Sequence, residues 1–107
     1  MKILINTTPG GFELSTIVMR TMYRERVPGI HNISKVDKDD YWLNVFEFQR
    51  NDLTAISIVE HIGLMFSAGP LCTLKIVEIP DNVECWEVQT TEYGVERVLY
   101  GQYQWVE

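Results

Sequence analysis

The fold is decided by residues 74–105, which read LKIVEIPDNVECWEVQTTEYGVERVLYGQYQW. Three runs in this stretch have the β-branched, aromatic or alternating composition of strands, at residues 74–79, 84–91 and 95–106. The turn-forming sequences Pro-Asp-Asn and Glu-Tyr-Gly separate them. The stretch therefore predicts three strands joined by two turns, the last of them long.

Two helices are expected upstream, and each has a capping residue. Ser15 stands where the hydroxyl of an N-cap belongs, ahead of a helix at residues 16–26 that has basic residues towards its end. A second helix begins at a cap provided by Asn51 or Asp52, and Gly63 ends it.

Two further strands complete the predicted order. Residues 2–6 form a short apolar run, and residues 41–48 are aromatic and partly alternating, while residues 64–73 are expected to be a connector. The prediction is one α+β domain over residues 1–107, in the order β-α-β-α-β-β-β. A single, mostly antiparallel sheet would have both helices on one face.

Composition and charge exclude several classes of function. The net charge of −6 is split between +3 in residues 1–36 and −9 in residues 37–107, so direct binding of nucleic acid is not expected. No apolar run approaches the roughly 18 residues of a membrane-spanning helix, so no membrane partner is expected. The acidic half has two readings, a solvated surface or a patch that docks on a basic partner protein or imitates a nucleic-acid backbone.

A glycine pair between the first strand and the first helix is a candidate anion site. Backbone N–H groups at such a loop can bind phosphate, and a nearby arginine can add a charged fork. The residues proposed for this site are Asn6, Thr7, Thr8, Gly10, Gly11 and Arg50. In the alternative reading, the glycines serve positive φ angles and close packing, and Arg50 pairs with Asp52 or lies on the surface.

Catalytic and metal-binding patterns are not found. Neither His31 nor His61 lies in a nucleophile motif, and the acidic run at residues 37–40 lacks the glycine and distal glutamate of a calcium loop. Cys72 and Cys85 have no metal-ligand spacing and are expected to be reduced. We therefore expect no catalytic residues, no metal and no cofactor, and a protein that is not an enzyme.

Aromatic residues near the end of the chain are candidates for binding a partner. Tyrosine and tryptophan are enriched in interface hot spots. The residues expected to contribute are Tyr93, Tyr100, Tyr103 and Trp105. The alternative is that they fill the core or cover the second face of the sheet. A long last strand at the sheet edge would also offer a template for a homodimer.

Three blocks of sequence resemble a family of small, uncharacterised proteins of tailed bacteriophages. The blocks are GGFELS at residues 10–15, RND followed by an apolar helix at residues 50–63, and LKIVEIPDNVE, WEV and EYG with a terminal aromatic residue at residues 74–105. The chain departs from the family pattern at Tyr93-Gly94, where relatives have Asp-Gly, and at Tyr100–Tyr103, where relatives have a basic run. The resemblance implies a phage origin and an accessory role during infection, without a known activity.

The leading hypothesis is thus a phage accessory protein in the host cytoplasm. It would bind a bacterial host protein, such as a defence or transcription component, and inhibit or redirect it. The alternative hypothesis is a sponge that sequesters a host signalling nucleotide at the glycine loop.

Overall fold

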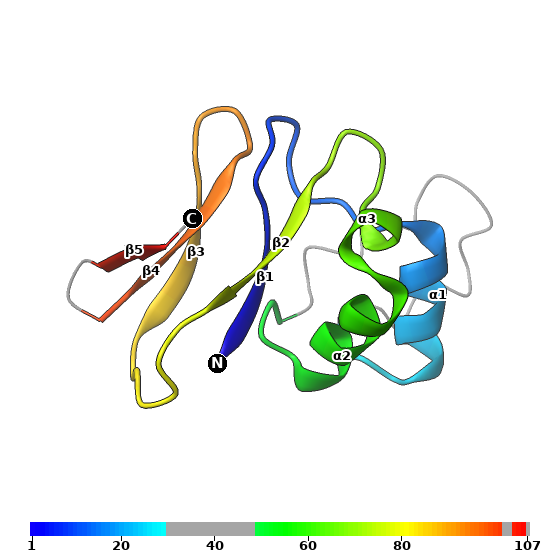
Figure 1. Ribbon diagram of the computed structural model, residues 1–107, viewed down its shortest axis with the longest axis horizontal. Helices are drawn as coiled ribbons and strands as arrows, with labels where there is room; N and C mark the ends of the chain where they lie inside the picture. The colour runs from blue at the N-terminus through cyan, green and yellow to red at the C-terminus, as the bar shows by residue number, and fades with distance from the viewer. Residues whose placement is uncertain (30–48, 102–103, 107) are drawn as a thin grey trace.

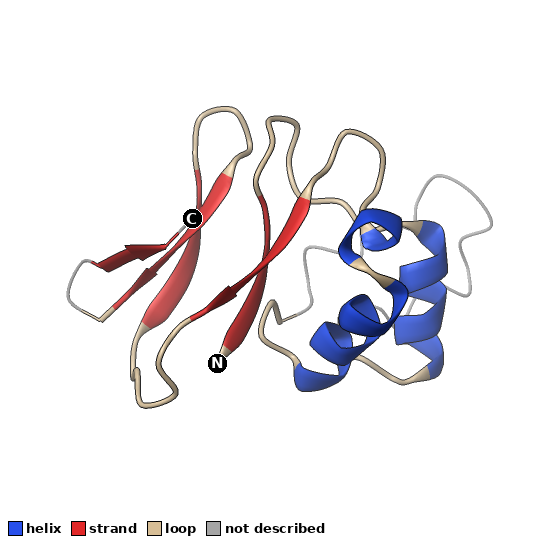
Figure 2. Cartoon of the chain, viewed as in Figure 1, coloured by secondary structure: helices blue, strands red, loops and turns tan. Residues whose placement is uncertain are grey.

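Three layers of secondary structure follow one another along the longest dimension of the molecule (Figure 1). The computed structural model describes residues 1–29 and 49–101, together with the backbone of residues 104–106. One layer is helical, the middle layer has two strands and the third has three strands (Figure 2). The elements are β1 (Lys2–Asn6), α1 (Thr16–Arg24), α2 (Leu53–Ile62), α3 (Leu64–Ser67), β2 (Leu74–Glu78), β3 (Trp86–Thr90), β4 (Glu96–Tyr100) and β5 (Gln104–Val106).

The middle layer is an antiparallel ribbon whose strand β1 is buried on both faces. β1 pairs with β2 so that Lys2 lies opposite Glu78 and Asn6 opposite Leu74. Leu4 points into the core beneath the helices, while Ile3 and Ile5 pack with Val98 of the three-stranded sheet. Burial on both faces explains why residues 2–6 form an apolar run without alternation.

The helix ends follow from the capping residues that the sequence predicts. The Ser15 hydroxyl accepts a hydrogen bond from the Val18 N–H at 3.4 Å, and the Asp52 carboxylate accepts one from the Ala55 N–H at 2.9 Å. Gly63 ends α2 with a φ of 101°. Both predicted helices are confirmed, although α1 stops at Arg24.

The prediction of a single sheet with two helices is wrong. The described strands form two sheets, and the described helices include α3 within the expected connector at residues 64–73. The physical reason lies at the edge of β1 that faces β4. There the Leu4 N–H is bonded to the Arg50 carbonyl and the Asn6 N–H to the Glu96 carboxylate, so β4 does not pair with β1.

The C-terminal strands differ from the predicted order, because two strands replace the single last one. The long final strand expected at residues 95–106 is split into β4 and β5, because the chain turns at Gly101 with a φ of 61°. β4 lies between β3 and β5, and both pairings are antiparallel. The strand expected at residues 41–48 lies outside the described residues. The α+β class is confirmed, and Cys72 and Cys85 are free thiols, as predicted.

Candidate functional site

The predicted anion-site arginine is paired with a buried glutamate. The Arg50 guanidinium donates two parallel hydrogen bonds to the Glu96 carboxylate, at 2.7 and 2.8 Å, and the Glu96 side chain is only 4% exposed. The guanidinium carbon also lies 3.5 Å from the centre of the Phe12 ring. Such a bidentate, stacked arrangement holds the arginine in place. Its partner is thus Glu96, whereas Asp52 caps α2.

Asn6 is saturated by hydrogen bonds within the protein. Its side-chain amide donates to the carbonyls of Thr8 and Gly94, at 2.6 and 3.0 Å. Its side-chain oxygen accepts from the Thr8 and Thr73 N–H groups, both at 3.2 Å. Asn6 is fully buried, so its role in the described structure is to fasten the loop after β1 to two neighbouring turns.

Gly10 and Gly11 pack directly against the turn between β3 and β4. The Gly10 N–H donates to the Tyr93 carbonyl at 2.8 Å. A Cβ atom on Gly94 would lie 2.5 Å from the Gly11 nitrogen, a distance that side-chain carbons essentially never reach. Both loop glycines have positive φ angles, 114° and 94°. The loop glycines therefore serve the left-handed backbone, and the close approach between the loop and the turn requires Gly94.

The residues proposed for the anion site lie in one neighbourhood, but the polar groups of Asn6, Gly10 and Arg50 are bonded to other protein groups. The charge of Arg50 is balanced by Glu96, and the Gly10 N–H is bonded to Tyr93. An anion at this loop would have to displace those partners, one of which carries a full negative charge.

The four proposed partner-binding aromatics have different surroundings. Tyr93 is 69% exposed in the turn between β3 and β4. Tyr100 is half-buried and packs against the core shared by the two sheets. Tyr103 lies outside the described residues, and of Trp105 only the backbone, in β5, is described. Of the two proposed aromatic side chains that the structure describes, Tyr93 is thus the one in solvent.

Other large apolar side chains are exposed as well, and the sequence did not single them out. Met65, Phe66 and Leu71 are 83%, 71% and 88% exposed. Leu71 borders the Gly10 loop, since its carbonyl accepts a hydrogen bond from the Thr8 hydroxyl at 3.2 Å. The three loops that carry Gly10, Leu71 and Tyr93 meet at one end of the molecule, at the top of Figure 1. We call Leu71 and Tyr93, whose loops both contact the Gly10 loop, the end surface.

Leu71 has a strained backbone as well as an exposed side chain. Residues 69–72 form a turn closed by a hydrogen bond from the Cys72 N–H to the Gly69 carbonyl at 3.2 Å. Pro70 occupies the second position and Leu71 the third, with a φ of 65°. A turn of this kind favours glycine or asparagine at its third position. Leucine there is disfavoured by the backbone and gains little from burial.

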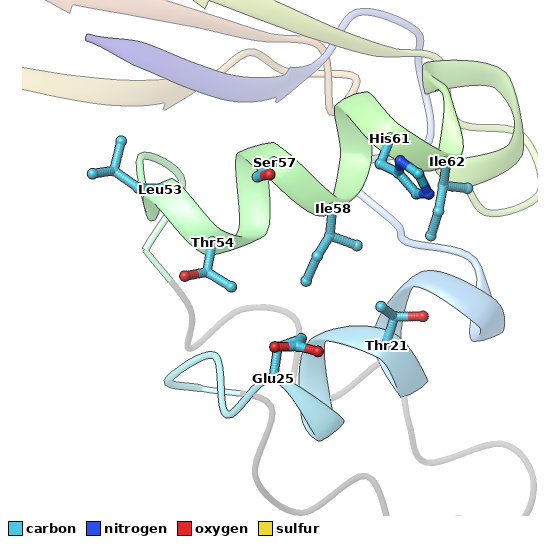
Figure 3. Close-up of a pocket in the computed structure, with 8 residues that line it drawn as sticks. All are labelled: Thr21, Glu25, Leu53, Thr54, Ser57, Ile58, His61 and Ile62. Atoms are coloured by element: carbon cyan, nitrogen blue, oxygen red, sulfur yellow. The ribbon is translucent and has the colours of Figure 1, made fainter.

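A groove of about 440 Å³ runs between α1 and α2 (Figure 3). Its walls are Thr21 and Glu25 from α1 and its cap, and Leu53, Thr54, Ser57, Ile58, His61 and Ile62 from α2. Ser57 and His61 lie one helical turn apart on α2. Within the described part of the chain they are not hydrogen-bonded to each other, so no nucleophile–base pair is formed there.

The described residues contain neither a metal-ion cluster nor a membrane-spanning helix. No group of three or more histidine, cysteine, aspartate or glutamate residues is placed to hold a metal ion in residues 1–29 and 49–101. In the same part of the chain, no helix has the length and apolar character needed to cross a bilayer.

The buried Glu96 and the turn residue Leu71 were missed in the sequence analysis, although the sequence contains a signal for each. Glu96 and Val98 are two residues apart, so both side chains point to the buried face of β4. A charged side chain on a buried strand face indicates a buried partner of opposite charge. Pro70 is typical of the second position of a turn, so it places Leu71 in a surface turn, although it does not determine the sign of φ there. The exposure of Met65 and Phe66 had no such signal.

The chain matches no protein-family profile, no curated protein and no solved structure. The resemblance to phage proteins therefore stays a prediction.

Proposed function

We propose that this chain is a phage accessory protein that binds a bacterial host protein in the host cytoplasm and inhibits or redirects it, without catalysing a reaction. The observation that carries the proposal is the end surface, and Leu71 above all. Leu71 combines 88% exposure with a φ of 65°. Neither feature stabilises the isolated chain, so a gain on binding is the physical reason to keep leucine there.

The partner we propose offers an apolar hollow with basic residues around it. An exposed leucine can fill an apolar hollow of a partner, and tyrosine is enriched among the residues that anchor interfaces. Glu92 is exposed next to Tyr93, and residues 49–101 contain eight acidic residues against three basic ones. Complementary charge on the host protein would speed association and fix its orientation.

The experiment begins with capture of a bacterial protein on the immobilised chain and continues with the purified partner. We expect Leu71→Gly and Tyr93→Ser each to weaken binding by about tenfold or more. Leu53→Ala is the matched control, because it removes a leucine of similar exposure, 82%, from the groove between α1 and α2. Leu71→Gly suits the backbone of the turn, so a loss of binding cannot be attributed to unfolding.

Two outcomes would contradict the proposal. In one, Leu53→Ala weakens binding as much as Leu71→Gly does. In the other, the chain alone forms a dimer in sedimentation experiments and Leu71→Gly dissociates it, which would assign the end surface to self-association.

A further inference from the structure

A second unusual backbone position lies at the other end of the helical layer, where α1 stops. Glu25 caps the helix, the Arg26 N–H donates to the Tyr23 carbonyl at 3.1 Å, and the Val27 N–H donates to the Met22 carbonyl at 2.9 Å. This pair of bonds is the Schellman motif, and its left-handed residue is most often glycine. Here that residue is Arg26, with a φ of 59°.

Arg26 borders a hollow together with a second arginine. The hollow has a volume of about 390 Å³ and is lined by Tyr23, Arg24, Arg26, Val27 and Pro28. Its volume is in the range of small-molecule sites. Arg24 and Arg26 are both exposed, and neither forms an ion pair with a described residue. Tyr23 and Pro28 add an apolar wall beside the two charges.

The acid between the two arginines does not neutralise them. Glu25 lines the groove on the other side of α1, where its side chain lies between α1 and α2 (Figure 3). The hollow also lies in a basic part of a chain whose net charge is −6, because residues 1–29 contain four basic residues and two acidic ones. Two guanidinium groups at one hollow, neither of them paired with a described acid, suit a phosphate group, which arginine binds with paired hydrogen bonds.

We propose that the hollow at the end of α1 binds a phosphorylated small molecule of nucleotide size, with Arg24 and Arg26 on the phosphate and Tyr23 and Pro28 against its flat or apolar part. Strain at Arg26 fits this role, because glycine would satisfy the backbone, whereas arginine adds a charge that can interact with the helix end and bind a ligand. The site is separate from the end surface and does not depend on the proposed host-binding function. It also differs from the Gly10 loop, where the arginine is already paired.

Calorimetric titration of the full chain tests the site with pyrophosphate, adenosine monophosphate and adenosine. We expect both phosphate-bearing probes to bind, and adenosine to bind at least about tenfold more weakly. Arg24→Gln and Arg26→Gly should each weaken binding of adenosine monophosphate by about tenfold or more. Arg26→Gly also relieves the backbone, so its melting temperature should be equal to or above that of the unmodified chain, which verifies folding.

Arg20→Gln is the matched control, because Arg20 is exposed one turn earlier on α1 and does not line the hollow. We expect it to leave the affinity within about twofold. The proposal is overturned if neither phosphate-bearing probe releases or takes up heat. It is equally overturned if adenosine binds as tightly as its monophosphate, or if Arg20→Gln weakens binding as much as Arg24→Gln.

Discussion

The turns on either side of the Gly10 loop each contain a residue with a positive φ angle, but one of these residues is a glycine and the other a leucine. In the turn at residues 91–94, the left-handed position is occupied by Gly94, with a φ of 91°. In the turn at residues 69–72 it is occupied by Leu71, with a φ of 65°. Gly94 touches the Gly11 backbone and has no room for a side chain, whereas the Leu71 side chain points into solvent.

We infer from this difference that the turn of Gly94 stabilises the fold, whereas the turn of Leu71 is available to bind a partner. The turn of Gly94 is bonded to Asn6, which is bonded in turn to the Glu96 carboxylate that holds Arg50. Each residue there is the one that its surroundings require. Leu71 is the opposite case, because its backbone and its exposure both favour another residue. Substitutions on the two sides should therefore differ in sign as well as in size.

The largest effect is expected at the buried ion pair. Glu96→Ala leaves the Arg50 guanidinium without its counter-charge and the Asn6 N–H without its acceptor. We expect the free energy of unfolding, measured by urea denaturation, to fall by about 3–5 kcal/mol. The control is Glu60→Ala, which breaks the exposed pair between Lys2 and Glu60. Solvent screens that pair, so a loss of similar size there would contradict a special role for the buried pair.

The next effect tests whether Gly94 is required for space or only for its φ angle. Gly63 has a similar φ, 101°, but a Cβ atom there would meet nothing within 4 Å. Gly63→Ala should therefore show the backbone strain alone, about 1–3 kcal/mol. Gly94→Ala should lose a further 1–3 kcal/mol or so, because the Gly11 backbone must move. Equal losses in thermal or urea unfolding would mean that the close approach is not important.

A smaller effect of opposite sign is expected at Leu71. Leu71→Gly removes the left-handed strain of a leucine, and this gain is partly offset by the greater freedom of glycine in the unfolded chain. The free energy of unfolding should rise by about 0.5–1 kcal/mol. Leu71→Asn should behave in the same way, because asparagine tolerates this conformation. If both variants lose stability, Leu71 packs within the fold and is not kept for binding.

The sequence predicted those parts of the fold that depend on local chemistry. Ser15, Asp52 and Gly63 mark helix ends because their interactions are made with the next few residues. The division into two sheets was not predictable in this way. It depends on Glu96 meeting Arg50 and the edge of β1, which are far from it in the chain.

The candidate sites show the same limit. The Gly10 loop was identified correctly as a place of left-handed glycines, but its partner is the turn of Gly94 and no sequence pattern joins the two. Tyr93 was selected as an aromatic residue and is exposed, while Tyr100 was selected for the same reason and packs against the core. Residue type alone does not distinguish these cases, since the outcome depends on which strand face is covered.

The smallest expected effect is a difference in thiol reactivity, and it tests whether the strained turn stays closed. Cys72 follows Leu71 and is half-buried, and burial raises the pKa of its thiol, whereas Cys85 is exposed. Only the thiolate reacts with iodoacetamide, so near about pH 8 Cys72 should be alkylated more slowly than Cys85, as followed by mass spectrometry. The alkylation rate of Cys72 should also keep rising to a higher pH than that of an ordinary cysteine.

Leu71→Gly sharpens the same measurement. If strain makes the turn at residues 69–72 open transiently, alkylation of Cys72 proceeds through this open state. The variant removes the strain, so it should open less often and its Cys72 should be alkylated more slowly. Cys85 is the internal control, since its carbonyl is bonded to the Gly101 N–H in a different part of the chain. Equal rates for the two cysteines in the unmodified chain would mean that the turn is open most of the time. In that case Leu71 would not be held in a left-handed conformation, and the contrast with Gly94 would fail.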